Sequence, residues 1–147
     1  MTDCGFCSYA ERRPELVIHT TSRWMLVHVD RFWPEGALYL VSRGHGLFSD
    51  LTVEDWREAA PLLSGCSRML VEVGGAERTY LASFSERSLH FHMLMFPKRS
   101  EHSAAHDGKK ATALLASLVA TDEPLDSTRV AEWVQRYRSA VESYVPG

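Results

Sequence analysis

Two histidines separated by a single residue are the most chemically suggestive feature of the sequence. His90 and His92 lie in the stretch 88–98, which reads SLHFHMLMFPK. In an extended strand successive side chains point to opposite faces, so both imidazoles would share one face, with Phe91 and Met93 on the other. On a helix the same spacing would turn the two rings about 200° apart. The pattern predicts a strand over 89–96 that presents two imidazoles together; a strand with two surface histidines is the simpler alternative.

A C-x-x-C pair near the start of the sequence offers two further groups that could do chemistry. Cys4 and Cys7 could form half of a zinc site, a redox pair, or two thiols that are close by chance. The redox interpretation is weak, because no thioredoxin-like strand pattern precedes the pair and no helix obviously starts at Cys4. Zinc would need two more ligands, and His45, in a glycine-flanked loop, and His90 are the best candidates. Together these four residues would form a closed tetrahedral Cys2His2 site.

If His90 serves the metal or the structure, His92 keeps a free imidazole on the same face. A neutral imidazole can attack phosphorus and form a covalent intermediate that a second acceptor resolves. Hydroxyl groups at Ser83, Ser85 and Ser88 are candidates to stabilise the phosphate oxygens. No second base is evident, so the leaving group must be a good one or receive its proton from elsewhere. A Ser88–His92 nucleophile and base is a less favoured alternative, because no acid is placed to orient the histidine.

The elements that must position these residues are strands followed by a helix, more strands and then helices. Five strands are predicted, over 16–19, 24–29, 37–42, 79–84 and 89–96. A helix is predicted to start near the capping residue Thr52 and to end at the Gly74–Gly75 pair, with Pro61 as a candidate kink. A polar loop over 98–110 precedes two helices, over 109–121 and 127–144. This order predicts an α+β domain with an antiparallel sheet.

Composition narrows the class of protein further. The 147 residues are 45% hydrophobic and 24% charged, as expected for one soluble globular domain. A formal charge of -3 provides no basic surplus for a polyanion, so nucleic acid is not expected as a main partner. No apolar run is long enough to span a membrane and the first residues lack a signal-peptide pattern, so a cytoplasmic protein is expected. Neither a Rossmann nor a Walker glycine-rich loop is present, which argues against dinucleotide-binding folds.

Taken together, these motifs resemble the histidine triad (HIT) superfamily of nucleotide hydrolases and transferases. The likeness runs from about Cys4 to Arg99 and includes the C-x-x-C, a hairpin, Ser42-Arg-Gly-His45, a helix and the H-x-H stretch ending in Pro97-Lys98. It implies a HIT-like antiparallel sheet with one central helix over residues 1–100. The loop and helices of 101–147 would pack on the same domain.

The resemblance also implies roles for individual residues. His92 matches the middle histidine of the family motif, which becomes nucleotidylated. In zinc-containing branches, such as the uridylyltransferases of galactose metabolism, the metal ligands match the four residues chosen above from the sequence: Cys4, Cys7, His45 and His90. Asp30 matches the family position near the ribose. A homodimer is also implied, for which the helix around Trp133 is a candidate contact.

The third histidine of the family motif is replaced by Leu94, which has no hydrogen-bonding group. In a second register, Ser88 would take the first position and His90 would be the nucleophile. The preferred register puts Pro97 at the family distance and supplies the fourth zinc ligand. The sequence therefore predicts a HIT-like nucleotidyl hydrolase or transferase that acts on the α-phosphate of a small-molecule nucleotide conjugate. The alternatives are a non-catalytic HIT-fold protein that binds a nucleotide or a partner, and a specialised small-molecule pathway enzyme with altered chemistry.

Overall fold

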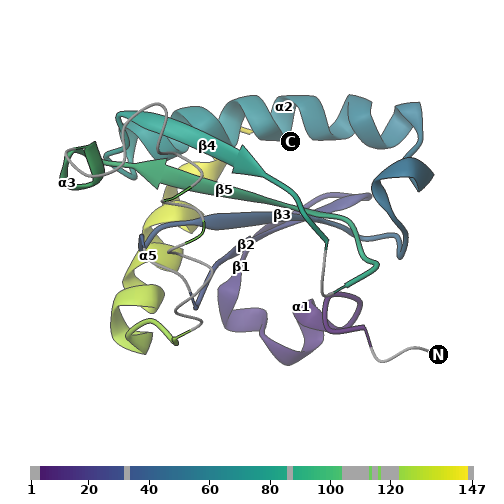
Figure 1. Ribbon diagram of the computed structural model, residues 1–147, viewed down its shortest axis with the longest axis horizontal. Helices are drawn as coiled ribbons and strands as arrows, with labels where there is room; N and C mark the ends of the chain where they lie inside the picture. Colours follow the sequence, from purple (N-terminus) through teal and green to yellow (C-terminus); the bar gives the residue numbers. More distant parts are fainter. Residues whose placement is uncertain are drawn as a thin grey trace.

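Five strands form one antiparallel sheet in the order β1-β2-β3-β5-β4 (Figure 1). The computed structural model describes residues 4–31, 34–85, 88–103 and 123–145, together with positions 113 and 116. The strands are β1 (Val17–Thr20), β2 (Trp24–His28), β3 (Leu38–Ser42), β4 (Arg78–Ala82) and β5 (His92–Lys98). The predicted α+β class and the antiparallel sheet are confirmed.

The two long helices each begin after a residue whose side chain caps them. The long helix α2 (Val53–Glu72) starts after Thr52, whose side chain and that of Asp55 satisfy each other's backbone N–H groups, and it continues through Pro61. Asp126 caps α5 (Ser127–Ala140) in a similar way. The shorter elements are α1 (Tyr9–Arg12), α3 (Ser100–Ser103) and the 3-10 turns η1 (Pro14–Leu16), η2 (Phe48–Asp50) and η4 (Val141–Ser143). Among the described residues, no helix has the length and apolar character of a membrane span.

Several predicted boundaries are wrong near the histidines. The strand predicted over 89–96 begins at His92, so His90 precedes it. The neighbouring strand β4 ends at Ala82, which pairs with Leu94, and the chain then turns at Ser85, whose φ is 49°. The first residue of β5, His92, pairs with Val41 of β3. The loop predicted over 98–110 starts instead with the end of β5 and the short helix α3. The predicted helix over 109–121 falls almost entirely outside the described residues.

One face of the sheet is covered by helices and carries the main core (Figure 1). Leu26 and Leu40 from the sheet and Leu62 from α2 are buried there, in the same cluster as Val134 and Tyr137 from α5. The guanidinium groups of Arg99 and Arg136 lie over the ring of Trp133, at 5.2 and 4.5 Å from its centroid. The apolar stripe of α5 is thus used largely within the protomer. The division of the chain at residue 100 stays a prediction.

Among the described residues, the N-terminal segment covers part of the opposite face of the sheet. Met25, Val27 and Val41 are buried on this face beneath Phe6 and Tyr9. A second small cluster contains Leu94 and Phe96 of β5, with Tyr39 and Tyr80 against it. This second face is where His92 lies, because it alternates with Met93 of the main core along β5.

Candidate functional site

Four side chains from three separate segments meet where the N-terminal segment approaches the sheet. Cys4 and Cys7 lie in the first turn, His45 follows β3, and His90 precedes β5. Their ligand atoms all lie within 4.8 Å of one another. The Sγ atoms of Cys4 and Cys7 are each 3.4 Å from Nδ1 of His90, and Cys7 Sγ is 3.3 Å from Nδ1 of His45. The structure thus brings together the four residues predicted as metal ligands.

Backbone hydrogen bonds set the position of each of these segments. The Cys7 N–H donates to the Cys4 carbonyl at 3.1 Å, which closes the turn between the two cysteines. The Phe91 N–H donates to the Gly46 carbonyl at 2.7 Å, which joins the loop of His45 to the segment of His90. Nε2 of the buried His90 lies 2.6 Å from the Ser42 carbonyl. Because a carbonyl only accepts, Nε2 must carry the proton, and Nδ1 directs a lone pair at the two thiols.

The two thiols are electrostatically unlike. Burial raises the pKa of Cys4, but hydrogen bonds from the backbone N–H groups of Cys7 and Phe6 and from the Ser88 hydroxyl outweigh it and bring the pKa to about 6. Burial raises the pKa of Cys7, and the neighbouring Cys4 sulfur raises it further. Cys4 is therefore largely a thiolate at neutral pH, which is the form that binds a metal.

The donor set and its spacing fit a tetrahedral ion. Bond lengths of about 2.3 Å to sulfur and about 2.0 to 2.1 Å to nitrogen, at tetrahedral angles, separate S and N ligand atoms by about 3.6 Å. The observed S to N distances of 3.3 to 3.4 Å are close to that value. Two sulfurs with two imidazole nitrogens are a common donor set for structural zinc. The cluster could therefore hold a metal ion.

His92 is held in one tautomer by the backbone. Its Nδ1 lies 2.9 Å from the His90 carbonyl, which can only accept a hydrogen bond, so Nδ1 carries the proton and Nε2 keeps its lone pair. Burial lowers the pKa of His92, against the opposing effect of this hydrogen bond, and His90 nearby lowers it further. The imidazole is therefore neutral at physiological pH, with Nε2 available as a nucleophile or hydrogen-bond acceptor.

Two aromatic rings, which the sequence patterns did not single out, enclose His92. Phe6 stacks on the imidazole with centroids 4.4 Å apart and planes at 30°. Tyr39 of β3 meets the same imidazole edge-on, at 5.3 Å and 86°. An aromatic residue inside the C-x-x-C was the one available signal for Phe6. Tyr39 belongs to the regular alternation of β3, which gives no indication of its neighbour across the sheet.

Leu94 lies two residues beyond His92, on the same face of β5. Its side chain is 9% exposed and packs with Val29, Ala37 and Phe96. The position of the third histidine in the family motif is thus part of an apolar cluster. The Leu94 side chain has no group that can donate a proton or a hydrogen bond.

Asp30 follows β2 and is already engaged by a neighbouring cation. Its carboxylate lies 2.6 Å from Nη1 of Arg13, and its side chain is 22% exposed. The same guanidinium contacts Glu15 at 2.6 Å through Nε. The Asp30 carbonyl accepts a hydrogen bond from the Leu125 N–H at 2.7 Å. The predicted contact of Asp30 with a ribose stays a prediction.

The three serines predicted to contact phosphate occupy different surroundings. The Ser83 hydroxyl donates to the His92 carbonyl at 2.7 Å, which ties the end of β4 to β5. Ser88 Oγ lies 3.8 Å from Cys4 Sγ, beside the cysteine and histidine cluster. Ser85 lies in the turn after β4 with its left-handed backbone. Contact of these serines with phosphate stays a prediction.

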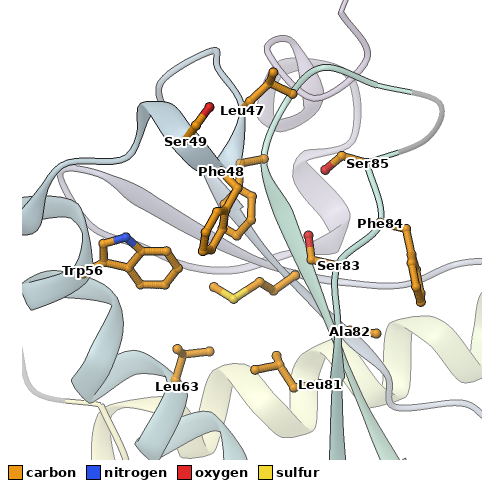
Figure 2. Close-up of a pocket in the computed structure, with 12 residues that line it drawn as sticks. Leu47, Phe48, Ser49, Trp56, Leu63, Leu81, Ala82, Ser83, Phe84 and Ser85 are labelled. Carbon is orange, nitrogen blue, oxygen red and sulfur yellow. The ribbon is translucent and has the colours of Figure 1, made fainter.

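An apolar hollow of about 690 Å³ opens on the helix-covered side of the sheet (Figure 2). Trp56 and Leu63 project into it from α2 and face Leu81 of β4, as Figure 2 shows. Phe91 and Met93 complete its inner wall, and Ser83 and Ser85 lie at its edge. His92 is not among its lining residues, because it points to the opposite face of the sheet from Met93. The hollow is therefore separate from the imidazole.

Comparison with solved structures identifies the fold. A Zn-bound histidine triad family protein from Mycobacterium smegmatis is 18% identical, with a TM-score of 0.68, and the alignment covers 96% of this chain and 94% of that one. A hypothetical histidine triad nucleotide-binding protein from Sulfolobus tokodaii is 13% identical, with a TM-score of 0.72, over 95% of this chain and 93% of that one.

A third similar structure is a diadenosine triphosphate hydrolase from Plasmodium falciparum. It is 12% identical, with a TM-score of 0.65, over 88% of this chain and 78% of that one. No model of a protein family and no curated protein sequence matches the chain. The likeness therefore rests on three-dimensional structure, and it agrees with the motifs in the sequence. The chain has the fold of the histidine triad superfamily.

Proposed function

We propose that the protein is a nucleotidyl hydrolase or transferase that attacks the α-phosphate of a nucleotide conjugate through Nε2 of His92. The observation that carries the proposal is the 2.9 Å hydrogen bond from His92 Nδ1 to the His90 carbonyl, which leaves a neutral Nε2 with its lone pair. A lone pair held in one direction is what a nucleophilic histidine needs. The histidine triad fold, and its occurrence in a diadenosine triphosphate hydrolase, support a reaction at a nucleotide phosphate.

The reaction would proceed in two displacement steps at phosphorus. Nε2 attacks the α-phosphorus, an N–P bond forms, and the bond from phosphorus to the leaving group breaks with its electron pair on the leaving group. Water or another acceptor then attacks phosphorus, the N–P bond breaks, and the acceptor's proton goes to solvent, which restores the neutral imidazole. Because Leu94 cannot donate a proton, the first step favours a leaving group that is stable as an anion or is protonated by solvent.

Zinc is the metal that we propose for Cys4, Cys7, His45 and His90. The support is the donor set, its spacing, and the zinc bound in a structural neighbour. When bound, the metal would act structurally by holding the N-terminal turn to the segment of His90, because all four tetrahedral positions are filled by protein. It would not itself activate water.

A nucleotide-binding protein without turnover is the second candidate. The packing of Leu94 among Val29, Ala37 and Phe96 favours it, because the leaving-group side of the site then contains no acid from that position. A nucleoside monophosphate could still lie against His92 in such a protein. Binding without turnover separates this candidate from the enzyme.

A homodimer is part of the proposal, through the edge strand β4 and its surroundings. β4 lies at the end of the sheet, and large apolar side chains are exposed beside it, with Phe48 at 65%, Leu81 at 54% and Phe84 at 63%. A second copy could pair with this edge, which no other described strand covers, and bury these side chains. Leu81→Glu should convert a dimer to a monomer in light scattering, and Trp133→Ala should not. The reverse result would place the contact on α5.

The enzyme is tested by incubation with adenosine phosphoramidate and with dinucleoside polyphosphates, followed by measurement of the released nucleoside monophosphate. We expect release by the wild type and none by His92→Ala. Calorimetric binding of a nucleoside monophosphate is measured in parallel. Binding by the wild type with no release from any conjugate would overturn the enzyme and favour the binding protein.

A further inference from the structure

The aromatic ring inside the C-x-x-C lies directly on the reactive imidazole. Phe6 and His92 have centroids 4.4 Å apart with planes at 30°, the arrangement of a stacked pair. Tyr39 contacts both rings edge-on, at 5.8 Å from Phe6 and 5.3 Å from His92. Tyr9 stacks on Phe6 from further along the segment, at 6.0 Å and 23°. One face of the imidazole is therefore covered by a side chain from the N-terminal segment.

The candidate metal ligands flank this same ring on both sides. Cys4 and Cys7 lie two residues before and one residue after Phe6, and both sulfurs approach Nδ1 of His90 at 3.4 Å. Within the turn the Cys7 N–H donates to the Cys4 carbonyl, and the Tyr9 N–H donates to the Phe6 carbonyl at 3.2 Å. The Arg12 guanidinium also donates to the Gly5 carbonyl at 2.9 Å, and Phe6 and Tyr9 pack on the face of the sheet. An ion bound by both cysteines would fix the backbone of Phe6 relative to the sheet.

We propose that Phe6 is a positioning residue that couples the metal site to His92. With metal bound, the Phe6 ring is held over the imidazole, fixes its plane and restricts water at that face. When the metal is lost, the N-terminal turn loosens and His92 becomes exposed. This proposal rests on the proposed function only where it treats His92 as the nucleophile. The coupling itself concerns how accessible the imidazole is.

The hydrogen bond to the His90 carbonyl and the bond from Cβ to the ring set the mean plane of the imidazole. Small rotations about χ1 and χ2 would still keep Nδ1 within hydrogen-bond distance of that carbonyl. Stacking by Phe6 and the edge contact of Tyr39 remove this freedom. A fixed Nε2 direction is what in-line attack on phosphorus requires.

The test measures how fast diethyl pyrocarbonate modifies His92, with the modified residue located by tandem mass spectrometry. This reagent acylates neutral, accessible imidazoles, so the rate reports cover of the ring and needs no nucleotide. Wild type, Phe6→Ala and Phe6→Leu are compared, each loaded with zinc and after removal of metal by a chelator. Phe6→Tyr, which keeps the ring, is the matched control. If Phe6→Ala unfolds the segment, Phe6→Leu still gives the comparison, because its side chain keeps Met25 and Val27 covered.

With zinc bound, we expect His92 to react about three- to tenfold faster in Phe6→Ala and Phe6→Leu than in the wild type, the range that corresponds to the free energy of one aromatic pair. Removal of metal should accelerate the wild type and Phe6→Tyr by a similar factor and leave the other two variants unchanged. Equal rates in all four zinc-loaded proteins would show that Phe6 does not shield the imidazole of His92. An equal acceleration by chelator in all four would overturn the coupling. Neither outcome depends on whether a nucleotide is turned over.

Discussion

The two faces of the sheet are built from alternate residues of the same strands, yet they differ in how they are covered. Met93 and Met95 of β5 lie in one core that is continuous beneath α2 and α5. His92 and Leu94, their neighbours along the strand, lie on the other face, where Phe6 of the N-terminal segment stacks on His92 and Leu94 belongs to a small separate cluster. The helix-covered face therefore stabilises the fold, and the opposite face is free to hold reactive groups near solvent.

This difference explains why His92 can be both neutral and accessible. A residue in the main core would be desolvated but sealed beneath a helix, whereas a fully exposed imidazole would have its ordinary pKa. His92 is half-buried under Phe6 and beside Tyr39, so burial lowers its pKa while one edge of the ring can still meet a ligand. Partial cover is thus the property that distinguishes this face.

Substitutions of His92 and Met93, which are neighbours on β5, should show the largest difference between the two faces of the sheet. We expect His92→Gln to lower turnover by on the order of 10³- to 10⁶-fold, as removal of a nucleophile does elsewhere, and to leave stability nearly unchanged. Met93→Ala should lower the free energy of unfolding by about 2 to 5 kcal/mol because it leaves a cavity in the core. Its turnover per folded molecule should stay near that of the wild type. Steady-state kinetics and urea unfolding check both; a stability loss in His92→Gln equal to that of Met93→Ala would break the comparison.

Loss of a metal ligand should have the next largest effect. Cys4→Ser should reduce bound zinc from about one per chain to near zero by elemental analysis. Where free zinc exceeds its Kd by a hundred- to a thousandfold, the lost binding should lower the free energy of unfolding by about 3 to 4 kcal/mol. Cys66→Ala is the matched control, because Cys66 is buried in the helix-covered core away from the cluster. Wild-type protein that is fully folded and free of zinc would contradict the site.

Protonation of a histidine on the helix-covered face should make the stability of the protein depend on pH. His28 is buried, its Nε2 accepts a hydrogen bond from the Gly36 N–H at 3.2 Å, and its Nδ1 has no partner among the described residues. Burial lowers the pKa of His28 from 6.5 to about 4. As the pH falls, His28 therefore binds a proton in the unfolded chain before it does so in the folded chain. The contribution of His28 to the free energy of unfolding is full above pH 6.5 and is lost as the pH falls toward 4.

The loss should amount to about 3 kcal/mol across that range, since each pKa unit corresponds to about 1.4 kcal/mol. His28→Gln keeps an acceptor for Gly36 and removes the titration, so its unfolding free energy should depend less on pH between 6.5 and 4. His19→Gln, on the neighbouring strand β1, is the control and should keep the wild-type dependence. Identical pH dependence in His28→Gln and the wild type would show that burial of His28 does not govern acid stability.

The smallest effect is expected at the bond that joins the ends of β4 and β5. Ser83→Ala removes the 2.7 Å hydrogen bond to the His92 carbonyl and should lower the free energy of unfolding by about 1 kcal/mol. Ser85→Ala, in the adjacent turn, serves as the control and should change stability less. Thermal unfolding and KM are measured together. A large rise in KM for Ser83→Ala with unchanged stability would show instead that the hydroxyl contacts substrate.

The sheet and the candidate metal ligands could be predicted because each depends on a local or chemical pattern. Alternation along the chain indicates strands, and two cysteines with two histidines are a recognisable donor set, so Cys4, Cys7, His45 and His90 could be grouped before their positions were known. The true start of β5 could not be predicted, since it depends on the pairing of His92 with Val41 of β3, which alternation along one strand does not specify.

The cover over His92 could not be predicted either. Phe6 and His92 are 86 positions apart, and nothing in the local pattern of either residue specifies a stacked contact. The hydrogen-bond partner of the Ser83 hydroxyl could not be predicted either. A serine near a predicted phosphate site can equally bond to the backbone, as it does here. Long-range contacts of single side chains are set by the tertiary structure and not by periodicity.

We propose that His90 and His92 have different tasks, with His90 directed to the metal cluster and His92 to phosphorus. This proposal is tested most directly by incubation of the zinc-loaded protein with adenosine phosphoramidate, a rapid quench under alkaline conditions that preserve the N–P bond, and location of the adenylyl group by tandem mass spectrometry. We predict one adenylyl group on His92, and none in His92→Ala. An adenylyl group on His90, or its persistence in His92→Ala, would contradict the account.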